Sequence, residues 1–228
     1  MRHRDYSIVV VDMVKHHCLK SNPEIEQIRY QEYLEKEQKY WPELPEEDKV
    51  FKRANFLHQL RMGSYRGNDQ TENLTNLMPS VLSEFRRSGA QIVHVYSRYN
   101  GPKETKPDFA VKPDSEDSIV SKIGDSFFEG TDPQEIHLPK KLAFCGVNLN
   151  VCVRASAIDA VKRGHQSYVL LDLTANDRMI ITLQRSTLNY LRRKGVIVTS
   201  VQKFKTILEN TRVQQRRIYK INQALRGF

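Results

Sequence analysis

The sequence predicts an α/β protein in which a doubly wound, mainly parallel sheet carries helices on both faces. Short runs rich in Val and Ile, such as residues 6–11, have the length and composition of buried strands. Segments with helical hydrophobic spacing separate these runs, and such alternation is typical of a parallel sheet. A length of 228 residues is enough for one domain with a hydrophobic core and is large for two.

The first strand, Tyr6-Ser-Ile-Val-Val-Val, is followed directly by Asp12. The segment after it differs in composition, because it is rich in Glu, Lys, Gln and Tyr. It predicts two helices at about 24–40 and 46–62, followed by a loop at 63–69. We expect a helical insertion at about 15–70 that covers a pocket or contacts another subunit; a surface elaboration is the alternative.

The remaining elements alternate along the chain. Helical spacing runs from Leu74 to Phe85 and ends at Ser88-Gly89, and Pro79 inside it predicts that the helix starts or kinks there. Further strands are expected at 90–96, 119–120, 142–147, 167–172 and 196–200. Further helices are expected at 150–163, at 177–194 and in the C-terminal tail.

The composition predicts a soluble globular protein, since 39% of the residues are hydrophobic and 28% are charged. No apolar run approaches the roughly 18 residues of a membrane span, so we expect no membrane association. The N-terminus lacks the features of a signal peptide, which favours the cytoplasm. The three cysteines form no CxxC pair, so neither a disulfide framework nor a zinc site is indicated.

The chain has a net charge of +9, and residues 211–228 contain five Arg or Lys and no acid. Such a tail could attract nucleic acid, anionic lipid or an acidic substrate. No nucleic-acid-binding motif accompanies it, so a solvated basic helix is favoured and nucleic-acid binding is not expected.

Three groups that could take part in catalysis follow predicted strands: Asp12, Lys122 and the turn Gly146–Cys152. Ligands bind beyond the carboxyl ends of parallel strands, so we expect them in one crevice. The positive end of the helix that begins near Cys152 favours a thiolate, and Asp12 could accept the thiol proton. A lone cysteine in apolar surroundings is alternatively an inert core residue, as is expected of Cys145.

Four segments carry a family resemblance. They are the strand ending in Asp12, Lys122-Ile-Gly-Asp-Ser126-Phe-Phe128-Glu-Gly130-Thr131, the block Gly146-Val-Asn-Leu-Asn-Val-Cys152-Val-Arg-Ala-Ser-Ala-Ile-Asp-Ala160, and Gly164-His with the strand into Asp172-Leu-Thr-Ala175. In this order they resemble the isochorismatase-like hydrolases. The resemblance covers about residues 5–12 and 71–200, and the block around Cys152 is its most specific part.

The resemblance implies a six-stranded parallel sheet, with Asp12 as general base, Lys122 as electrostatic partner and Cys152 as nucleophile. It implies a cis peptide between Val147 and Asn148, with the backbone amides of Asn148 and Cys152 facing the substrate oxyanion. Asn148, Phe127 and Phe128 would contact the substrate; the two rings could equally belong to the core. Because isochorismatases proper lack the cysteine, the implied reaction is cleavage of a small amide or ureido C–N bond through a thioester.

The sequence departs from this family in two places. The usual D-x-Q-x-x-F motif is not continued after Asp12, which leaves the identity of the substrate open. The Asp-x-His pair of metal-binding relatives is absent between the first strand and Lys122. His16, His17, His58 and His94 are therefore interpreted as surface or packing residues, and no metal or other cofactor is expected.

We therefore expect one isochorismatase-like domain at 1–210, with a basic C-terminal helix or tail at 211–228. The expected partners are a small-molecule substrate and further copies of the chain in a homo-oligomer. The alternative is a catalytically drifted protein of the same fold that acts as a binding or scaffold module through its insertion and basic tail. A nucleic-acid binder is a third possibility that rests on charge alone.

Overall fold

Six parallel strands form one sheet in the order β3-β2-β1-β4-β5-β6. The computed structural model describes residues 5–18, 23–40, 42–43, 45–50, 53, 68–97, 107–129, 136–176, 184–210 and 213. The strands are β1 (Tyr6–Val11), β2 (Gln91–Ser97), β3 (Ser118–Lys122), β4 (Lys141–Val147), β5 (Gln166–Ala175) and β6 (Ile197–Thr199).

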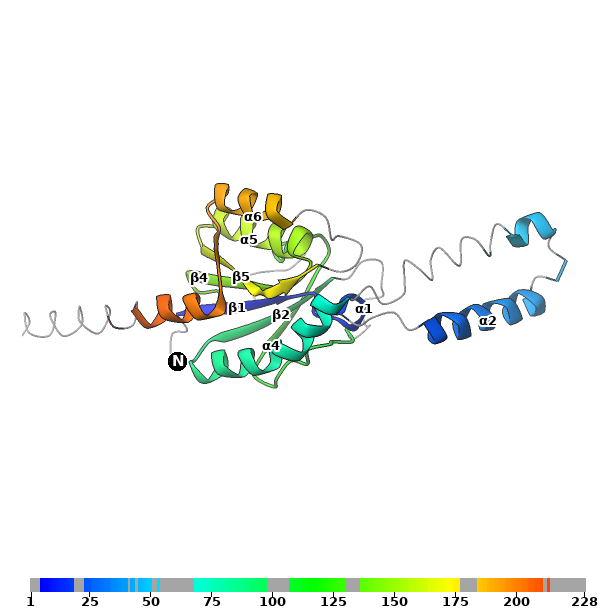
Figure 1. Ribbon diagram of the computed structural model, residues 1–228, viewed down its shortest axis with the longest axis horizontal. Helices are drawn as coiled ribbons and strands as arrows, with labels where there is room; N and C mark the ends of the chain where they lie inside the picture. The colour runs from blue at the N-terminus through cyan, green and yellow to red at the C-terminus, as the bar shows by residue number, and fades with distance from the viewer. Residues whose placement is uncertain are drawn as a thin grey trace, which may run out of the picture.

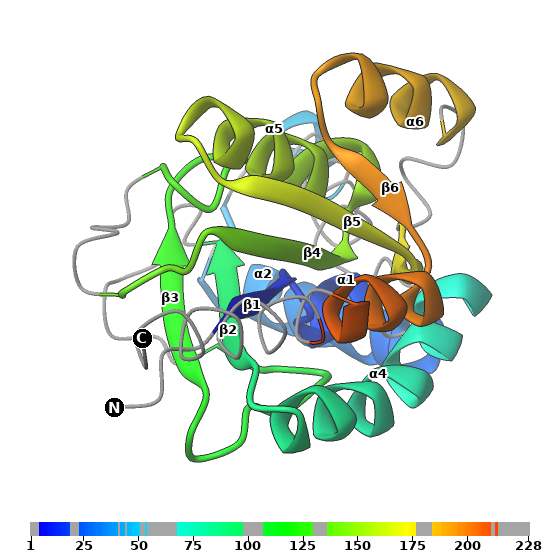
Figure 2. The ribbon, with the colours of Figure 1, turned by 90° about the vertical axis from the view of Figure 1, so that its left-hand side faces the viewer.

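Helices cover both faces of this sheet (Figure 1, Figure 2). One face carries α4 (Asp69–Arg87) and the helical residues 201–210, and the other carries α5 (Arg154–Lys162) and α6 (Gln184–Arg193). The predicted α/β class and the six-stranded sheet are confirmed.

The alternation of side chains along β1 explains why both faces need a cover. Tyr6, Ile8 and Val10 belong to the hydrophobic cluster beneath α4, whereas Val9 and Val11 belong to the cluster beneath α5. All six residues of β1 are buried, as expected for the interior strand of a parallel sheet. The centre of the sheet is therefore a rigid base for whatever follows β1.

Two predicted helices differ in detail from those observed. α4 starts at Asp69, where the side chain of Asn68 caps it, and it continues through Pro79, so the helix does not begin at the proline. The predicted helix 150–163 is instead a π-helical turn, η2 (Leu149–Val153), that leads directly into α5. Cys152 therefore lies in η2 and not in the first turn of an ordinary helix.

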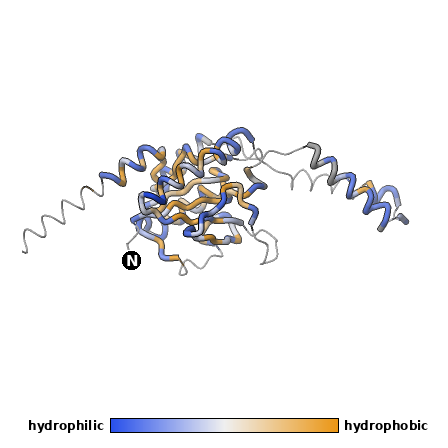
Figure 3. Tube along the Cα trace, turned by 90° about the horizontal axis from the view of Figure 1, so that it is seen from below, coloured by the Kyte–Doolittle hydropathy of each residue, from blue (hydrophilic) through white to orange (hydrophobic). Residues whose placement is uncertain are grey.

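The described part of the predicted insertion contains the short helix α1 (Lys15–Cys18), the long helix α2 (Pro23–Tyr40) and the helical residues 46–50. We call α2 together with the described residues 42–43, 45–50 and 53 the arm. Figure 1 shows the arm standing away from the sheet on the side of α1. The residues of the arm that are coloured by hydropathy are mostly hydrophilic (Figure 3).

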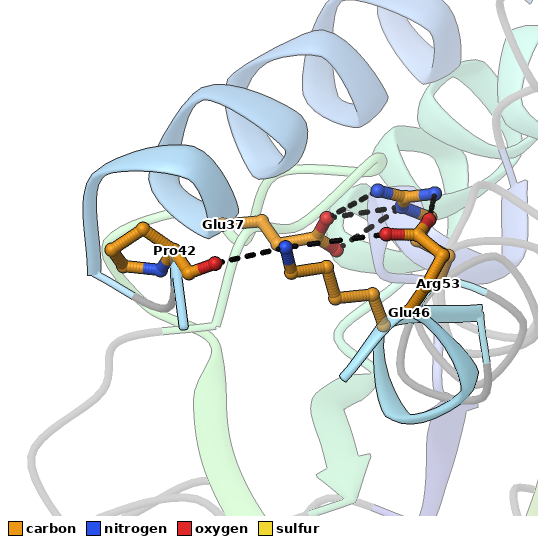
Figure 4. Close-up of polar contacts among 5 residues, drawn as sticks. Glu37, Pro42, Glu46 and Arg53 are labelled. Atoms are coloured by element: carbon orange, nitrogen blue, oxygen red, sulfur yellow. Dashed lines mark hydrogen bonds and ion pairs between the residues drawn. The ribbon is translucent and has the colours of Figure 1, made fainter. Parts of the chain in front are cut away.

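The arm is held together by charged side chains (Figure 4). The guanidinium group of Arg53 contacts the carboxylate of Glu37 at 2.6 Å and that of Glu46 at 2.9 Å. Lys49 Nζ donates a hydrogen bond to the carbonyl oxygen of Pro42 at 3.1 Å. These contacts join α2 to the helical residues that follow it.

Several predictions fall outside the described residues. They concern residues 54–62 of the second insertion helix, the loop at 63–67, and the tail at 211–228 apart from Val213. None of the helices that the structure describes is long and apolar enough to cross a membrane.

Candidate active site

Four neighbouring strands end at one edge of the sheet and bring the predicted residues together. Lys122 is the last residue of β3, Ser97 is the last residue of β2, Asp12 follows β1, and the turn containing Cys152 follows β4. The chain order reverses between β1 and β4, which is where open parallel sheets bind ligands.

The ammonium group of Lys122 is the centre of this cluster. Its Nζ lies 3.0 Å from Asp12 Oδ2, 3.2 Å from Cys152 Sγ and 3.0 Å from the carbonyl oxygen of Gly124. These three acceptors match the three N–H groups of an ammonium. Burial lowers the pKa of Lys122, but the interactions with Asp12 and Cys152 outweigh burial and raise that pKa, so the side chain is a buried cation.

Asp12 is buried and is held by β2 through both its backbone and its side chain. It has a positive φ of 48°, in the left-handed region that is uncommon for residues other than glycine. Its N–H donates to the carbonyl oxygen of Val95 at 2.8 Å. The Ser97 hydroxyl donates to its carboxylate, at 3.0 Å from Oδ1 and 3.2 Å from Oδ2.

Cys152 is buried beside both a carboxylate and an ammonium group. Burial raises the pKa of Cys152 to about 12, the charge of Asp12 and a hydrogen bond with it add to this effect, and Lys122 only partly opposes it. The direction of this pKa change opposes the stabilisation of a thiolate expected from the helix start. The other route to a nucleophile, an adjacent base, agrees with the geometry.

The turn that carries Cys152 depends on close contact between β1 and β4. Gly146 has a φ of 106°, and a Cβ atom there would lie 2.1 Å from the carbonyl oxygen of Val11, so only glycine fits. The Val147–Asn148 peptide bond is cis. The carbonyl oxygen of Asn148 accepts hydrogen bonds from the N–H groups of Val151 and Val153, which closes η2.

A family model, the isochorismatase domain, matches residues 54–203, which is 150 of the 228 residues. The chain belongs to the isochorismatase family. The match includes Lys122 and Cys152, whereas Asp12 lies before it; the structure adds Asp12 by placing β1 next to β4.

Solved structures share the isochorismatase-family fold along most of their length. An isochorismatase-like hydrolase from Alkaliphilus metalliredigens is 19% identical, with a TM-score of 0.61 over 90% of this chain and 98% of that one. A cysteine hydrolase from Pseudomonas syringae pv. phaseolicola is 17% identical, with a TM-score of 0.60 over 90% of this chain and 93% of that one. N-carbamoylsarcosine amidase from Thermoplasma acidophilum is 18% identical, with a TM-score of 0.55 over 87% of this chain and 97% of that one. At these identities the likeness shows the fold alone, and a search of curated proteins finds no match.

The two phenylalanines of the isochorismatase-like segment after Lys122 have core contacts. Phe127 is fully buried and belongs to the hydrophobic cluster beneath α5. Phe128 stacks on His165 at a centroid distance of 6.2 Å and lies 4.7 Å below the guanidinium of Arg163, beyond the C-terminal end of α5. These contacts favour the core interpretation, and contact with substrate stays a prediction for both rings.

Sequence reasoning missed two polar residues that support the site. One is Ser97, which has no motif of its own and stands out only once the strand order places β2 beside β1. The other is Asn176, which follows β5. Its Oδ1 accepts from the N–H of Asn150 at 2.9 Å and its backbone carbonyl accepts from Asn68 Nδ2 at 2.9 Å. Asn176 therefore ties η2 to the start of α4.

The other predicted candidates lie away from this cluster. Cys145 is buried in the cluster beneath α4, where burial first and the charge of Asp172 second raise its pKa above the ordinary value. His94 is buried, with Nε2 3.1 Å from Asp117 Oδ2. His58 and the side chains of His16 and His17 lie outside the description. Among described residues, no three His, Cys, Asp or Glu side chains converge as a metal site; the absence of a metal stays a prediction.

Proposed function

We propose that this protein is a cysteine hydrolase that cleaves a small amide or ureido C–N bond through a thioester intermediate. The observation that carries the proposal is the buried Lys122 ammonium, which contacts the Asp12 carboxylate and the Cys152 sulfur simultaneously. A hydrolase and an amidase among the structures of the same fold agree with this reaction class.

In the first half-reaction, Asp12 accepts the proton of the Cys152 thiol while the sulfur attacks the carbonyl carbon. The pKa of about 12 makes such a base necessary, because few thiolates exist at neutral pH without it. Lys122 stabilises the negative charge as it moves from the carboxylate to the sulfur. We assign the backbone amides of Asn148 and Cys152 to the oxyanion of the tetrahedral intermediate.

The intermediate then collapses and the C–N bond breaks. The leaving nitrogen takes the proton from Asp12, so that ammonia or an amine departs and the acyl group remains on Cys152 as a thioester. In the second half-reaction Asp12 deprotonates water, whose oxygen attacks the thioester carbon. The released Cys152 sulfur recovers the proton, which returns the site to its starting state.

The proposal is tested by ammonia release from a panel of small primary amides and ureido compounds. We expect Cys152→Ala to lower the rate by on the order of a thousand-fold or more, because nothing else forms the thioester. Cys145→Ala is the matched control, since Cys145 is also buried but lies in the cluster beneath α4. It should retain activity, and mass spectrometry of quenched wild-type protein should find the acyl group on Cys152.

An active Cys152→Ala variant would refute the proposal. A small-molecule substrate and a homo-oligomeric state belong to the same proposal. The drifted binding protein is favoured instead if the wild-type protein hydrolyses no member of the panel.

A further inference from the structure

Ser97 contacts the base of the proposed triad without belonging to it. It is the last residue of β2, opposite Lys122 in the register of the β2–β3 pair. Its hydroxyl lies 3.0 Å from Asp12 Oδ1 and 3.2 Å from Asp12 Oδ2. A hydroxyl has a single proton, and here it is shared between the two oxygens of one carboxylate.

The Asp12 carboxylate needs more than one partner to be held in a fixed orientation. Lys122 Nζ lies 3.0 Å from Oδ2, and a carboxylate anchored at one oxygen can still turn about its Cβ–Cγ bond. The Ser97 hydroxyl is nearest to Oδ1, so the two donors together fix the carboxylate plane. Only in a fixed plane does a lone pair of Asp12 stay directed at the thiol of Cys152.

The same strand also holds the backbone of Asp12. The N–H of Asp12 donates to Val95, two residues before Ser97 on β2. The following carbonyl, that of Met13, accepts from the N–H of Ala110 at 2.9 Å. Asp12 is thus held on both sides in its left-handed conformation, and Ser97 is the contact that acts on the reacting group itself.

We propose that Ser97 is a positioning residue that orients the Asp12 carboxylate, so that Asp12 can take the proton of Cys152. The inference rests on the proposed function, since it assigns a role within the same site. Loss of the hydroxyl leaves the carboxylate able to turn about its Cβ–Cγ bond, which makes the base less well aimed at the thiol.

The test compares Ser97→Ala with Ser97→Thr and with Ser7→Ala. Ser97→Thr keeps the hydroxyl. Ser7→Ala is the matched control, because Ser7 of β1 bonds Gln91 of β2 at 2.7 Å, so it removes a hydrogen bond between the same two strands at their opposite end. Circular dichroism and thermal unfolding check that all three variants fold.

For Ser97→Ala we expect kcat/KM to fall about ten-fold. We also expect the loss to fall mainly on kcat, with KM changed less, because the orientation of Asp12 matters in the proton transfer and not in substrate binding. Ser97→Thr should restore most of kcat, and Ser7→Ala should keep the wild-type values. The inference is wrong if Ser97→Ala keeps the wild-type kcat, or if Ser97→Thr is as impaired as Ser97→Ala.

A second measurement needs no substrate. The carboxyl carbon resonance of Asp12, assigned by its absence in Asp12→Asn, should change its chemical shift in Ser97→Ala, which lacks the hydroxyl bonded to this carboxylate, and keep it in Ser7→Ala. An unchanged chemical shift in Ser97→Ala overturns the inference. An active Cys152→Ala variant would refute the proposed function itself. If Cys152→Ala is inactive while Ser97→Ala keeps wild-type activity, the proposed function stands and only the role of Ser97 is refuted.

Discussion

The active-site cluster and the arm both place one cation between two acidic groups, but the two cations differ in their exposure to water. In the site, Lys122 lies between Asp12 and Cys152, and the side chains of Lys122 and Asp12 are 0% and 2% exposed. In the arm, Arg53 is 31% exposed and lies between Glu37, which is 2% exposed, and Glu46, which is 65% exposed. The residues of the site come from three strand ends, whereas those of the arm lie within one short segment.

The comparison shows that the burial of a charged cluster and the elements that hold it, and not its pattern of charges, decide whether it can take part in proton transfer. A charge removed from water interacts strongly with its neighbours and changes their pKa values, as Asp12 does to Cys152. A charge in partial contact with water is screened and contributes little. The site cluster is therefore suited to moving a proton, and the arm cluster to joining two helices.

The largest expected effect is that of removing the buried cation. Lys122→Met leaves the Asp12 carboxylate buried without a counter-ion, and we expect it to abolish hydrolysis and to lower the free energy of unfolding by about 3–5 kcal/mol. Arg53→Met makes the same chemical change in the arm. Arg53→Met also leaves a buried carboxylate, that of Glu37, but the arm stands away from the sheet (Figure 1), so the main urea-unfolding transition should shift only for Lys122→Met. Equal midpoints of that transition for the two variants would remove the distinction drawn between the clusters.

The second effect concerns the reactivity of the cysteine with pH. Because the pKa of Cys152 is raised to about 12, its thiolate fraction rises about ten-fold per pH unit below that value. Alkylation of Cys152 by iodoacetamide, followed by mass spectrometry, should therefore keep rising from pH 7 to pH 10 without a plateau.

The variant Asp12→Asn tests the origin of the raised pKa of Cys152, because the charge of Asp12 is one of its causes. Its removal lowers the pKa of Cys152, so alkylation at pH 8 should become faster while hydrolysis, which needs the base, is lost. Cys145 is the internal control and should react only after unfolding. A plateau near neutral pH in the wild-type protein would mean that Cys152 is a thiolate at rest.

The smallest expected effect is in the arm. Arg53→Met removes the contacts with Glu37 and Glu46, so we expect faster cleavage of the arm by thermolysin, with the main unfolding transition and the hydrolytic rate unchanged. Glu46→Gln, which removes only the more exposed partner, should change cleavage less. Light scattering of the same variants measures the oligomeric state. If Arg53→Met dissociates an oligomer and lowers activity, the arm belongs to a subunit interface.

Much of the site could be predicted because Asp12, Lys122 and the turn that carries Cys152 follow predicted strands, and the resemblance to the isochorismatase-like hydrolases implied their roles. Ser97 was missed because a serine at the end of a strand carries no local signal. The raised pKa of Cys152 could not be predicted, because the sequence shows neither its burial nor the carboxylate beside it.

Local hydrophobic periodicity determined the α/β class and most strand positions, because it depends on neighbours within a few positions of the chain. The resemblance of four sequence segments to the isochorismatase-like hydrolases implied the three residues of the proposed triad. Tertiary structure alone decided the rest. The strand order places β1 between β2 and β4, which brings Asp12, Lys122 and Cys152 within hydrogen-bonding distance and gives Asp12 its second donor, Ser97. Packing on both faces of the sheet then removes these groups from water, and that burial raises the pKa of Cys152, which favours a mechanism with an adjacent base.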